Sequence, residues 1–132
     1  MSTSLGFDFG THKIGIAVGQ TITATASPLI TLSYIKQQPD WDGISDIINE
    51  WKPDTLVVGL PFQMDDQEAE LAGRAKRFAR RLEGRYKLPT EMIDERLTSR
   101  EASDRLGKKA GKDVTLVDSM AAKLILETWL NK

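Results

Sequence analysis

The sequence predicts an α/β protein built on a mixed β-sheet with helices on its faces. Two observations support this prediction. The first 32 residues hold three strand-like segments separated by short turns, as in an antiparallel meander. The apolar residues then change to helical spacing, and helices alternate with short apolar strands in the order β-β-β-α-β-α-β-α-α. A meander followed by alternating helices and strands is typical of a mixed sheet.

The three N-terminal strands are predicted from alternation and turn residues. The segment "LGFDF" (5–9) alternates, and "KIGIAVG" (13–19) is its predicted hairpin partner, with Gly10 in the turn. Residues 21–32 are rich in Thr, Ile and Ala and predict a third antiparallel strand, broken near Pro28. Asp8 therefore lies at the end of the first strand, just before the chain turns.

The middle of the chain predicts a helix and then a central strand. An apolar stripe with spacings of three and four predicts the helix, which Asp40 or Asp42 can cap and Pro53 ends; the stripe is Trp41, Ile44, Ile48 and Trp51. The unbroken apolar run "TLVVGL" (55–60), followed by Pro61, is typical of a buried parallel strand.

The rest of the chain continues this alternation. Leu71, Ala75, Phe78 and Leu82 mark a helix that we expect to end at Gly84, and "TEMID" (90–94) predicts a strand. Thr98 and Glu101 have capping-box spacing and predict a short helix that stops at Gly107. Residues 116–130 predict the last helix, with plausible core contacts at Val117, Met120, Ala121, Leu124 and Trp129.

Length and composition set limits on function. The 132 residues predict a single domain, 1–132, and the hydrophobic (40%) and charged (28%) fractions are ordinary for a globular protein. The absence of cysteine excludes disulfides, thiolate zinc sites and a cysteine nucleophile, and the single His12 cannot build a multi-histidine metal site. No signal peptide or membrane-length apolar run is present, so we expect a cytoplasmic protein without a membrane partner.

Basic residues are concentrated in one segment of a chain whose net charge is −1. Residues 74–87 hold seven basic residues and one acid, and the spacing of Arg74, Arg77 and Arg81 puts these three on one helix face beside the apolar stripe. A smaller cluster follows at 105–112, which we expect to flank the cleft. The segment is either a solvated helix face or a footprint for nucleic-acid phosphates.

Three acidic positions fall at predicted strand or helix ends rather than on solvated faces. They are Asp8, the pair Asp94 and Glu95 after the last strand, and Asp118 in the first turn of the last helix. Singly, each has a structural explanation: an Asx turn, a surface pair with Arg96, or a helix cap. Converging carboxylates repel one another unless a cation joins them, and oxygen-only ligands favour Mg²⁺ or Mn²⁺.

Four segments resemble, in order and spacing, the signature blocks of the YqgF/RuvX family: "DFGTHKIGIAVG", "VVGLPFQMD", "DERLTS" and "VDSMAAKLILE". The resemblance covers nearly the whole chain and implies a ribonuclease H-like fold with metal-dependent phosphodiester hydrolysis. It implies Asp8, Glu95 and Asp118 as catalytic and metal-binding acids. The chain departs from the family pattern at His12 and Lys13, where Lys and often Arg are usual, and at Asp66, where Gly is usual.

The resemblance implies a nuclease that processes the 5′ end of pre-16S rRNA during ribosome biogenesis. Two ions would hold the scissile phosphate, with Asp8 as the bridging ligand, and Lys13 and Arg96 could contact phosphate. The alternatives are a Holliday junction resolvase-like DNA endonuclease, a non-catalytic nucleic-acid-binding module and an ATP-binding actin or sugar-kinase-like domain. The expected partners are structured RNA or branched DNA, bound by a monomer or a homodimer.

Overall fold

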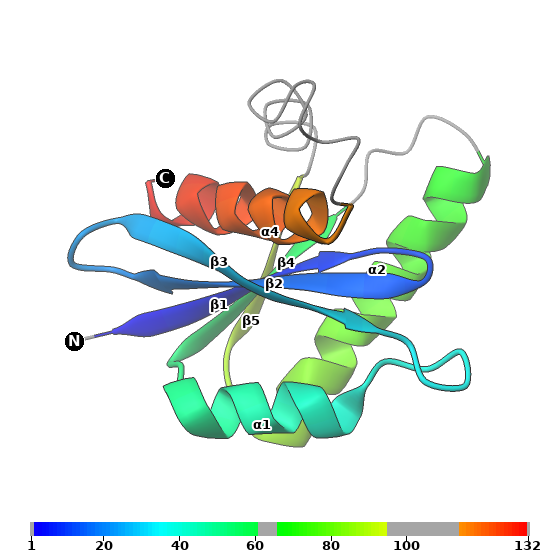
Figure 1. Ribbon diagram of the computed structural model, residues 1–132, viewed down its shortest axis with the longest axis horizontal. Coiled ribbons are helices and arrows are strands. Elements are labelled where there is room, and N and C mark those ends of the chain that lie inside the picture. Colours follow the sequence, from blue (N-terminus) through cyan, green and yellow to red (C-terminus); the bar gives the residue numbers. More distant parts are fainter. Residues whose placement is uncertain (1, 61–65, 95–113, 132) are drawn as a thin grey trace.

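The computed structural model describes residues 2–60, 66–94 and 114–131 (Figure 1). The predicted short helix at 98–107 and the basic cluster at 105–112 lie outside these residues. In chain order the described elements are β1 (Thr3–Phe9), β2 (Lys13–Gln20), β3 (Thr25–Ser33), α1 (Trp41–Trp51), β4 (Thr55–Leu60), α2 (Asp66–Tyr86), β5 (Thr90–Asp94) and α4 (Val114–Leu130).

The strands form one five-stranded mixed sheet in the order β3-β2-β1-β4-β5. The β1–β2 and β2–β3 pairs are antiparallel, whereas β4 is parallel to both β1 and β5. The predicted mixed sheet is therefore confirmed. The third strand begins at Thr25 rather than at residue 21, and it continues through Pro28 because the β2–β3 register shifts between Ile16 and Ala17.

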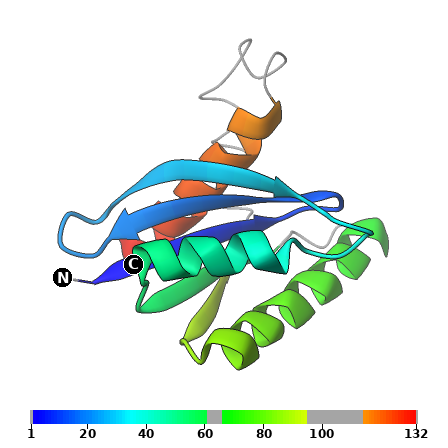
Figure 2. The same ribbon diagram turned by 60° about the horizontal axis from the view of Figure 1, so that its bottom comes forward.

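Helices cover both faces of the sheet, as expected: α4 lies on one face, and α1 and α2 lie on the other (Figures 1 and 2). Because strand residues alternate, Leu5, Phe7 and Phe9 of the central strand β1 all enter the core under α1 and α2. Gly6 faces α4 instead, where an added Cβ would lie only 2.9 Å from Cβ of Leu126. Every second residue of β1 therefore belongs to the α4 face.

Local sequence explains the ends of α1. Asp40 caps its start, since its Oδ1 accepts a hydrogen bond from the Gly43 amide at 2.9 Å. Lys52 ends it in the left-handed conformation, with φ of 47°, just before Pro53. Ile44, Ile47 and Ile48 are buried, whereas Trp51, the last residue of the predicted apolar stripe, is 36% exposed.

The predicted end of α2 at Gly84 is wrong, because the helix continues to Tyr86. Gly84 is exposed in open space, so the helix accepts it at a cost of about 1 kcal/mol relative to alanine. The predicted stripe of α2 is otherwise present: Ala75, Phe78 and Leu82 are buried.

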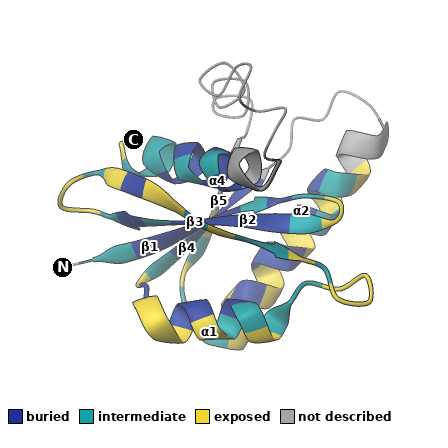
Figure 3. Cartoon of the chain, viewed as in Figure 1, coloured by how far each residue is buried: buried dark blue, intermediate teal, exposed yellow. Residues whose placement is uncertain are grey.

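Helix α4 is predominantly apolar, and its described part carries buried and half-buried residues (Figure 3). Its buried apolar residues belong to two clusters. Ala122, Ile125 and Leu126 are buried with residues of the sheet, whereas Ala121 and Leu124 form a separate small cluster with Met120. Within the described part of the chain, no helix is both long and apolar enough to cross a membrane.

Candidate active site

The carboxylate-bearing residue Asp8 lies between two glycines in the centre of the sheet. Its partner on β2 is Gly15, and its partner on β4 is Gly59. Residues that are paired across strands point to the same face, so neither neighbour places a side chain beside Asp8. The importance of these two glycines was not predicted from the sequence, although the "KIGIAVG" and "TLVVGL" segments contain them. Asp8 is therefore flanked in the sheet by two residues that carry no side chain.

Asp8 lies on the face that α4 covers. Alternation along β1 puts it on the same face as Gly6, which is in contact with Ala122 and Leu126 of α4. Further along α4, Leu130 approaches Gly19, and Gly19 pairs with Ser4 near the start of β1. Helix α4 therefore runs opposite to β1, and its N-terminal end points toward the end of β1 that carries Asp8 (Figure 1).

The helix position of Asp118 follows from this packing. Asp118 is one turn before Ala122, a step of about 6 Å along a helix, and Asp8 is two residues beyond Gly6, a step of about 7 Å along a strand. The backbone of α4 at 118 therefore lies near Asp8. The side chain of Asp118 is not among those that the structure describes.

The third predicted acid follows β5, which is the edge strand next to β4. Asp94 is the last residue of β5 and pairs with Leu60 at the end of β4. Glu95 and Arg96 lie outside the described residues. Among the residues that are described, no group of three potential metal ligands is found.

The turn between β1 and β2 is held by Tyr34, which follows β3. The Tyr34 hydroxyl donates a hydrogen bond to the Gly10 carbonyl, and its backbone N–H donates to the His12 carbonyl at 3.0 Å. Gly10 has no room for a side chain, since an added Cβ would lie 2.8 Å from the Lys13 carbonyl oxygen. The role of Tyr34 was not predicted from the sequence, because nothing in local spacing connects residue 34 with residue 10.

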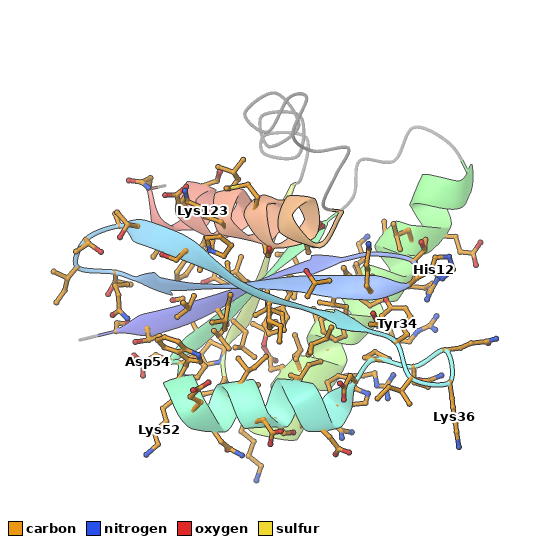
Figure 4. All side chains as sticks on the ribbon, viewed as in Figure 1. His12, Tyr34, Lys36, Lys52, Asp54 and Lys123 are labelled. Carbon is orange, nitrogen blue, oxygen red and sulfur yellow. The ribbon has the colours of Figure 1, made fainter. Side chains whose placement is uncertain are left out.

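Burial raises the pKa of Tyr34 to about 12, partly opposed by the positive charge of Arg74. The hydroxyl therefore stays protonated at neutral pH and can donate to Gly10. Figure 4 shows Tyr34 and His12 at the same end of the sheet. Lys13 begins β2, and strand alternation puts it on the Asp8 face together with Gly15 and Ala17.

The three predicted arginines of α2 line one cavity of about 140 Å³. The other described lining residues come from β1, α2 and the chain between β3 and α1: Phe9, Tyr34, Gln37, Gln38, Pro39 and Phe78. None of the described lining residues is acidic. Phe9 and Phe78 belong to the core under α1 and α2, so Arg74, Arg77 and Arg81 lie on the opposite face of the sheet from Asp8.

Aromatic rings hold several of these guanidinium groups. The Arg74 guanidinium carbon lies 5.7 Å from the ring centre of Phe9, and that of Arg81 lies 4.9 Å from the ring centre of Trp41. Arg85 also lies over Trp41, at 4.3 Å. Such cation–π contacts each contribute about 0.5–1 kcal/mol at exposed sites, so they favour a defined position for long, charged side chains.

A wider groove of about 550 Å³ adjoins the arginine cavity. Its described lining residues are Thr11, His12, Tyr34, Gln37 and Arg74. Tyr34, Gln37 and Arg74 line both spaces. The groove therefore connects the β1–β2 turn, which begins two residues after Asp8, with the cavity on the other face.

The sheet order and the acid at the end of the central strand define a protein of the ribonuclease H-like fold. Two solved structures support the fold: a Thermus thermophilus RuvC in complex with a Holliday junction substrate (15% identical, TM-score 0.57, covering 98% of this chain and 94% of that chain) and the fowlpox virus Holliday junction resolvase (9% identical, TM-score 0.60, covering 98% and 97%). At these identities the likeness concerns the fold alone.

The family model described as "RuvX: Holliday junction resolvase" matches residues 2–132, and the chain belongs to this family. A Saccharophagus degradans protein is 52% identical over 130 residues, covering 96% of this chain and 92% of its own length. An Azotobacter vinelandii protein is 50% identical over 129 residues, covering 96% and 91%. Both carry the name "Putative pre-16S rRNA nuclease".

Proposed function

We propose that this protein is a metal-dependent nuclease that hydrolyses phosphodiester bonds in pre-16S rRNA. The observation that carries the proposal is about 50% identity, over nearly the full length, to relatives named as nucleases of this RNA. The position of Asp8 supports the same conclusion, because this acid lies near the end of the central strand and both of its ladder partners are glycines without side chains.

The acids proposed to bind metal are Asp8, Glu95 and Asp118. The chemistry of Asp8 fits a hard divalent cation, since carboxylate oxygens are the preferred ligands of Mg²⁺ and Mn²⁺ and the adjacent glycines carry no competing side chain. The path of α4 toward the end of β1 favours Asp118 as a second ligand. A bound divalent ion supplies positive charge that activates a water molecule and stabilises the leaving oxygen.

Strand alternation favours Glu95 over Asp94 as the third acid. Met92 packs on the α1 and α2 face, and Ile93 packs on the α4 face. A residue two positions after Ile93 shares its face in a regular strand, whereas Asp94 does not. The same reasoning favours Lys13 as a phosphate contact, because alternation along β2 puts it on the Asp8 face. Arg96 is proposed as a further contact on sequence grounds alone.

Cleavage assays with full-length protein test this function. The substrates are a pre-16S rRNA fragment and a synthetic four-way DNA junction of similar length, each with Mg²⁺, with Mn²⁺ and with EDTA. We expect divalent-dependent cleavage of the RNA, and none by Asp8→Asn. Cleavage that continues in EDTA, or no cleavage of the RNA under any condition, would contradict the proposal.

The second candidate function is resolution of four-way DNA junctions. It is favoured by the description of the matching family as Holliday junction resolvase. The same assay separates the two functions, because efficient, symmetrical cleavage of the junction without cleavage of the RNA would establish the second. Resolving a junction requires two cuts, so that result should be accompanied by a homodimer in sedimentation analysis.

A further inference from the structure

We propose that the arginine cavity on the α2 face is a binding subsite for a single-stranded segment that flanks the cleavage site. The inference rests on the proposed nuclease function and deepens it. The two faces of the sheet then differ in function: the α4 face carries the acids, and the α2 face carries phosphate-binding arginines. The segment connects the two by crossing the β1–β2 turn.

The charge of the cavity identifies the ligand as anionic. Arg74, Arg77 and Arg81 line it, and the described part of the chain places no carboxylate against it. The described lining therefore offers no carboxylate to neutralise these three positive charges, although the chain as a whole has a net charge of −1. Guanidinium groups bind phosphate through paired N–H donors, so a phosphodiester backbone fits this lining.

The lining of the cavity favours an unpaired strand over a duplex. Its volume is about 140 Å³, and it adjoins the larger groove of about 550 Å³. That space admits a phosphate group with part of its nucleotide. Single-stranded binding sites typically combine positive charge with aromatic side chains, and here the half-buried Tyr34 lines the cavity beside the arginines. The exposed amides of Gln37 and Gln38 can form hydrogen bonds with an unpaired base.

The route from the acids to the arginines is short. Asp8 and Phe9 are consecutive residues, about 3.8 Å apart between Cα atoms, and they point to opposite faces of the sheet. Arg74 lies over the ring of Phe9. Beyond the end of β1, the groove lined by Thr11 and His12 leads into the arginine cavity. A strand whose scissile phosphate lies at Asp8 can therefore pass over the turn and reach Arg74.

The two flanks of α2 provide a matched control. Lys76 and Arg80 are exposed on the same helix but line a different cavity, together with Glu83, Thr90 and others. If the subsite is specific, charge on that flank has little effect. If α2 attracts nucleic acid only through its total charge, removing either set weakens binding to a similar extent per charge.

Binding is measured by fluorescence anisotropy with a labelled single-stranded octanucleotide and a blunt duplex, in EDTA so that no cleavage occurs. We expect the single strand to bind more tightly to the wild type than the duplex does. The variant Arg74→Gln/Arg77→Gln/Arg81→Gln should lose this preference, and its log–log salt slope should be smaller by roughly two, at about 0.7 per lost contact on single strands. The variant Lys76→Gln/Arg80→Gln should retain the preference.

A single variant covers the case in which the triple variant folds poorly. Arg77 is exposed, and no ring contact is found for it among the described residues, so Arg77→Glu should keep the fold while reversing one charge of the cavity. It should weaken single-strand binding at least fivefold. An unchanged salt slope in the triple variant, duplex binding as tight as single-strand binding, or equal losses in the control would each overturn the subsite.

Failure of this inference can be told apart from failure of the proposed function. If the wild-type protein cleaves pre-16S rRNA and the arginine variants bind the single strand normally, only the subsite is wrong. If the wild-type protein cleaves no substrate but the arginine variants lose single-strand binding, the subsite stands and the nuclease function does not.

Discussion

Asp8 of β1 pairs with Gly59 of β4 in the parallel ladder at the centre of the sheet. On its other side Asp8 pairs with Gly15 of β2. A residue at the centre of a sheet normally has a neighbouring side chain on each flanking strand, and here both of those neighbours are glycine. Neither flanking strand therefore places a side chain beside the carboxylate, which is why we expect chemistry at this position rather than a purely structural role.

Substitution of Asp8 by asparagine should abolish cleavage and preserve the fold. The side chains are nearly equal in size, but the amide lacks the negative charge that holds a divalent ion. The assay is Mg²⁺-dependent cleavage of pre-16S rRNA, with far-ultraviolet circular dichroism as the control for folding. Wild-type rates in Asp8→Asn would remove Asp8 from the mechanism.

A methyl group beside Asp8 should impair cleavage without removing any charged residue. Gly59→Ala and Gly15→Ala each add a Cβ on the face of the sheet that carries the carboxylate. Because a displacement of about 1 Å can slow a reaction by about 10²-fold, we expect at least one of the two variants to cleave the RNA roughly tenfold to a hundredfold more slowly than the wild type at saturating substrate. If both variants fold and cleave at the wild-type rate, glycine at these two positions has no catalytic importance.

Gly6 and Gly73 should respond in opposite ways to alanine. At Gly6 a Cβ would meet the Ala122 carbonyl oxygen at 3.0 Å, and this backbone atom cannot move without shifting α4. Gly6→Ala should therefore lower the free energy of unfolding by about 1–3 kcal/mol. Gly73 is exposed in α2 with open space around it, so Gly73→Ala should raise that free energy by about 0.5–1 kcal/mol. Urea unfolding of the two variants measures both changes in the free energy of unfolding. A Gly6→Ala variant more stable than the wild type would contradict the close packing of α4 on β1.

Tyr34→Phe should destabilise the protein by about 1 kcal/mol at pH 8, since the Gly10 carbonyl loses its donor. In the folded protein the Tyr34 pKa is raised from 10.0 to about 12, so the folded state holds the proton more tightly. The stabilisation of the folded state by the protonated Tyr34 hydroxyl is fully present below pH 10 and is lost as the pH rises toward 12.

The difference in unfolding free energy between wild type and Tyr34→Phe should therefore shrink between pH 10 and 12. Comparing the two proteins at each pH removes the effects of other titrating groups. A difference that stays constant across this range would mean that the folded protein does not hold the Tyr34 proton more tightly than the unfolded chain does.

Much of the fold could be predicted from the sequence, because strands and helices have different apolar periods. Alternation in "LGFDF" and the three-and-four spacing around Ile44 each specify a local conformation and the residues that share a face. The differences occur at helix ends: α2 continues past Gly84 to Tyr86, which packs against Trp41 and shares a hydrogen bond with Ser45, and Trp51 stays partly exposed at the end of α1.

For the candidate site, the sequence by itself determined the residue types: an acid before a glycine turn, arginines on one helix face, and no sulfur or clustered imidazole to compete as ligands. Only the tertiary structure decided what these residues are next to. Gly59 lies beside Asp8, Tyr34 holds Gly10, and the arginines lie across the sheet from the acid. Periodicity is a property of neighbouring residues, whereas these relationships join segments 24 to more than 60 residues apart, which meet only when the strand order and the helix faces are set by burial of the whole core.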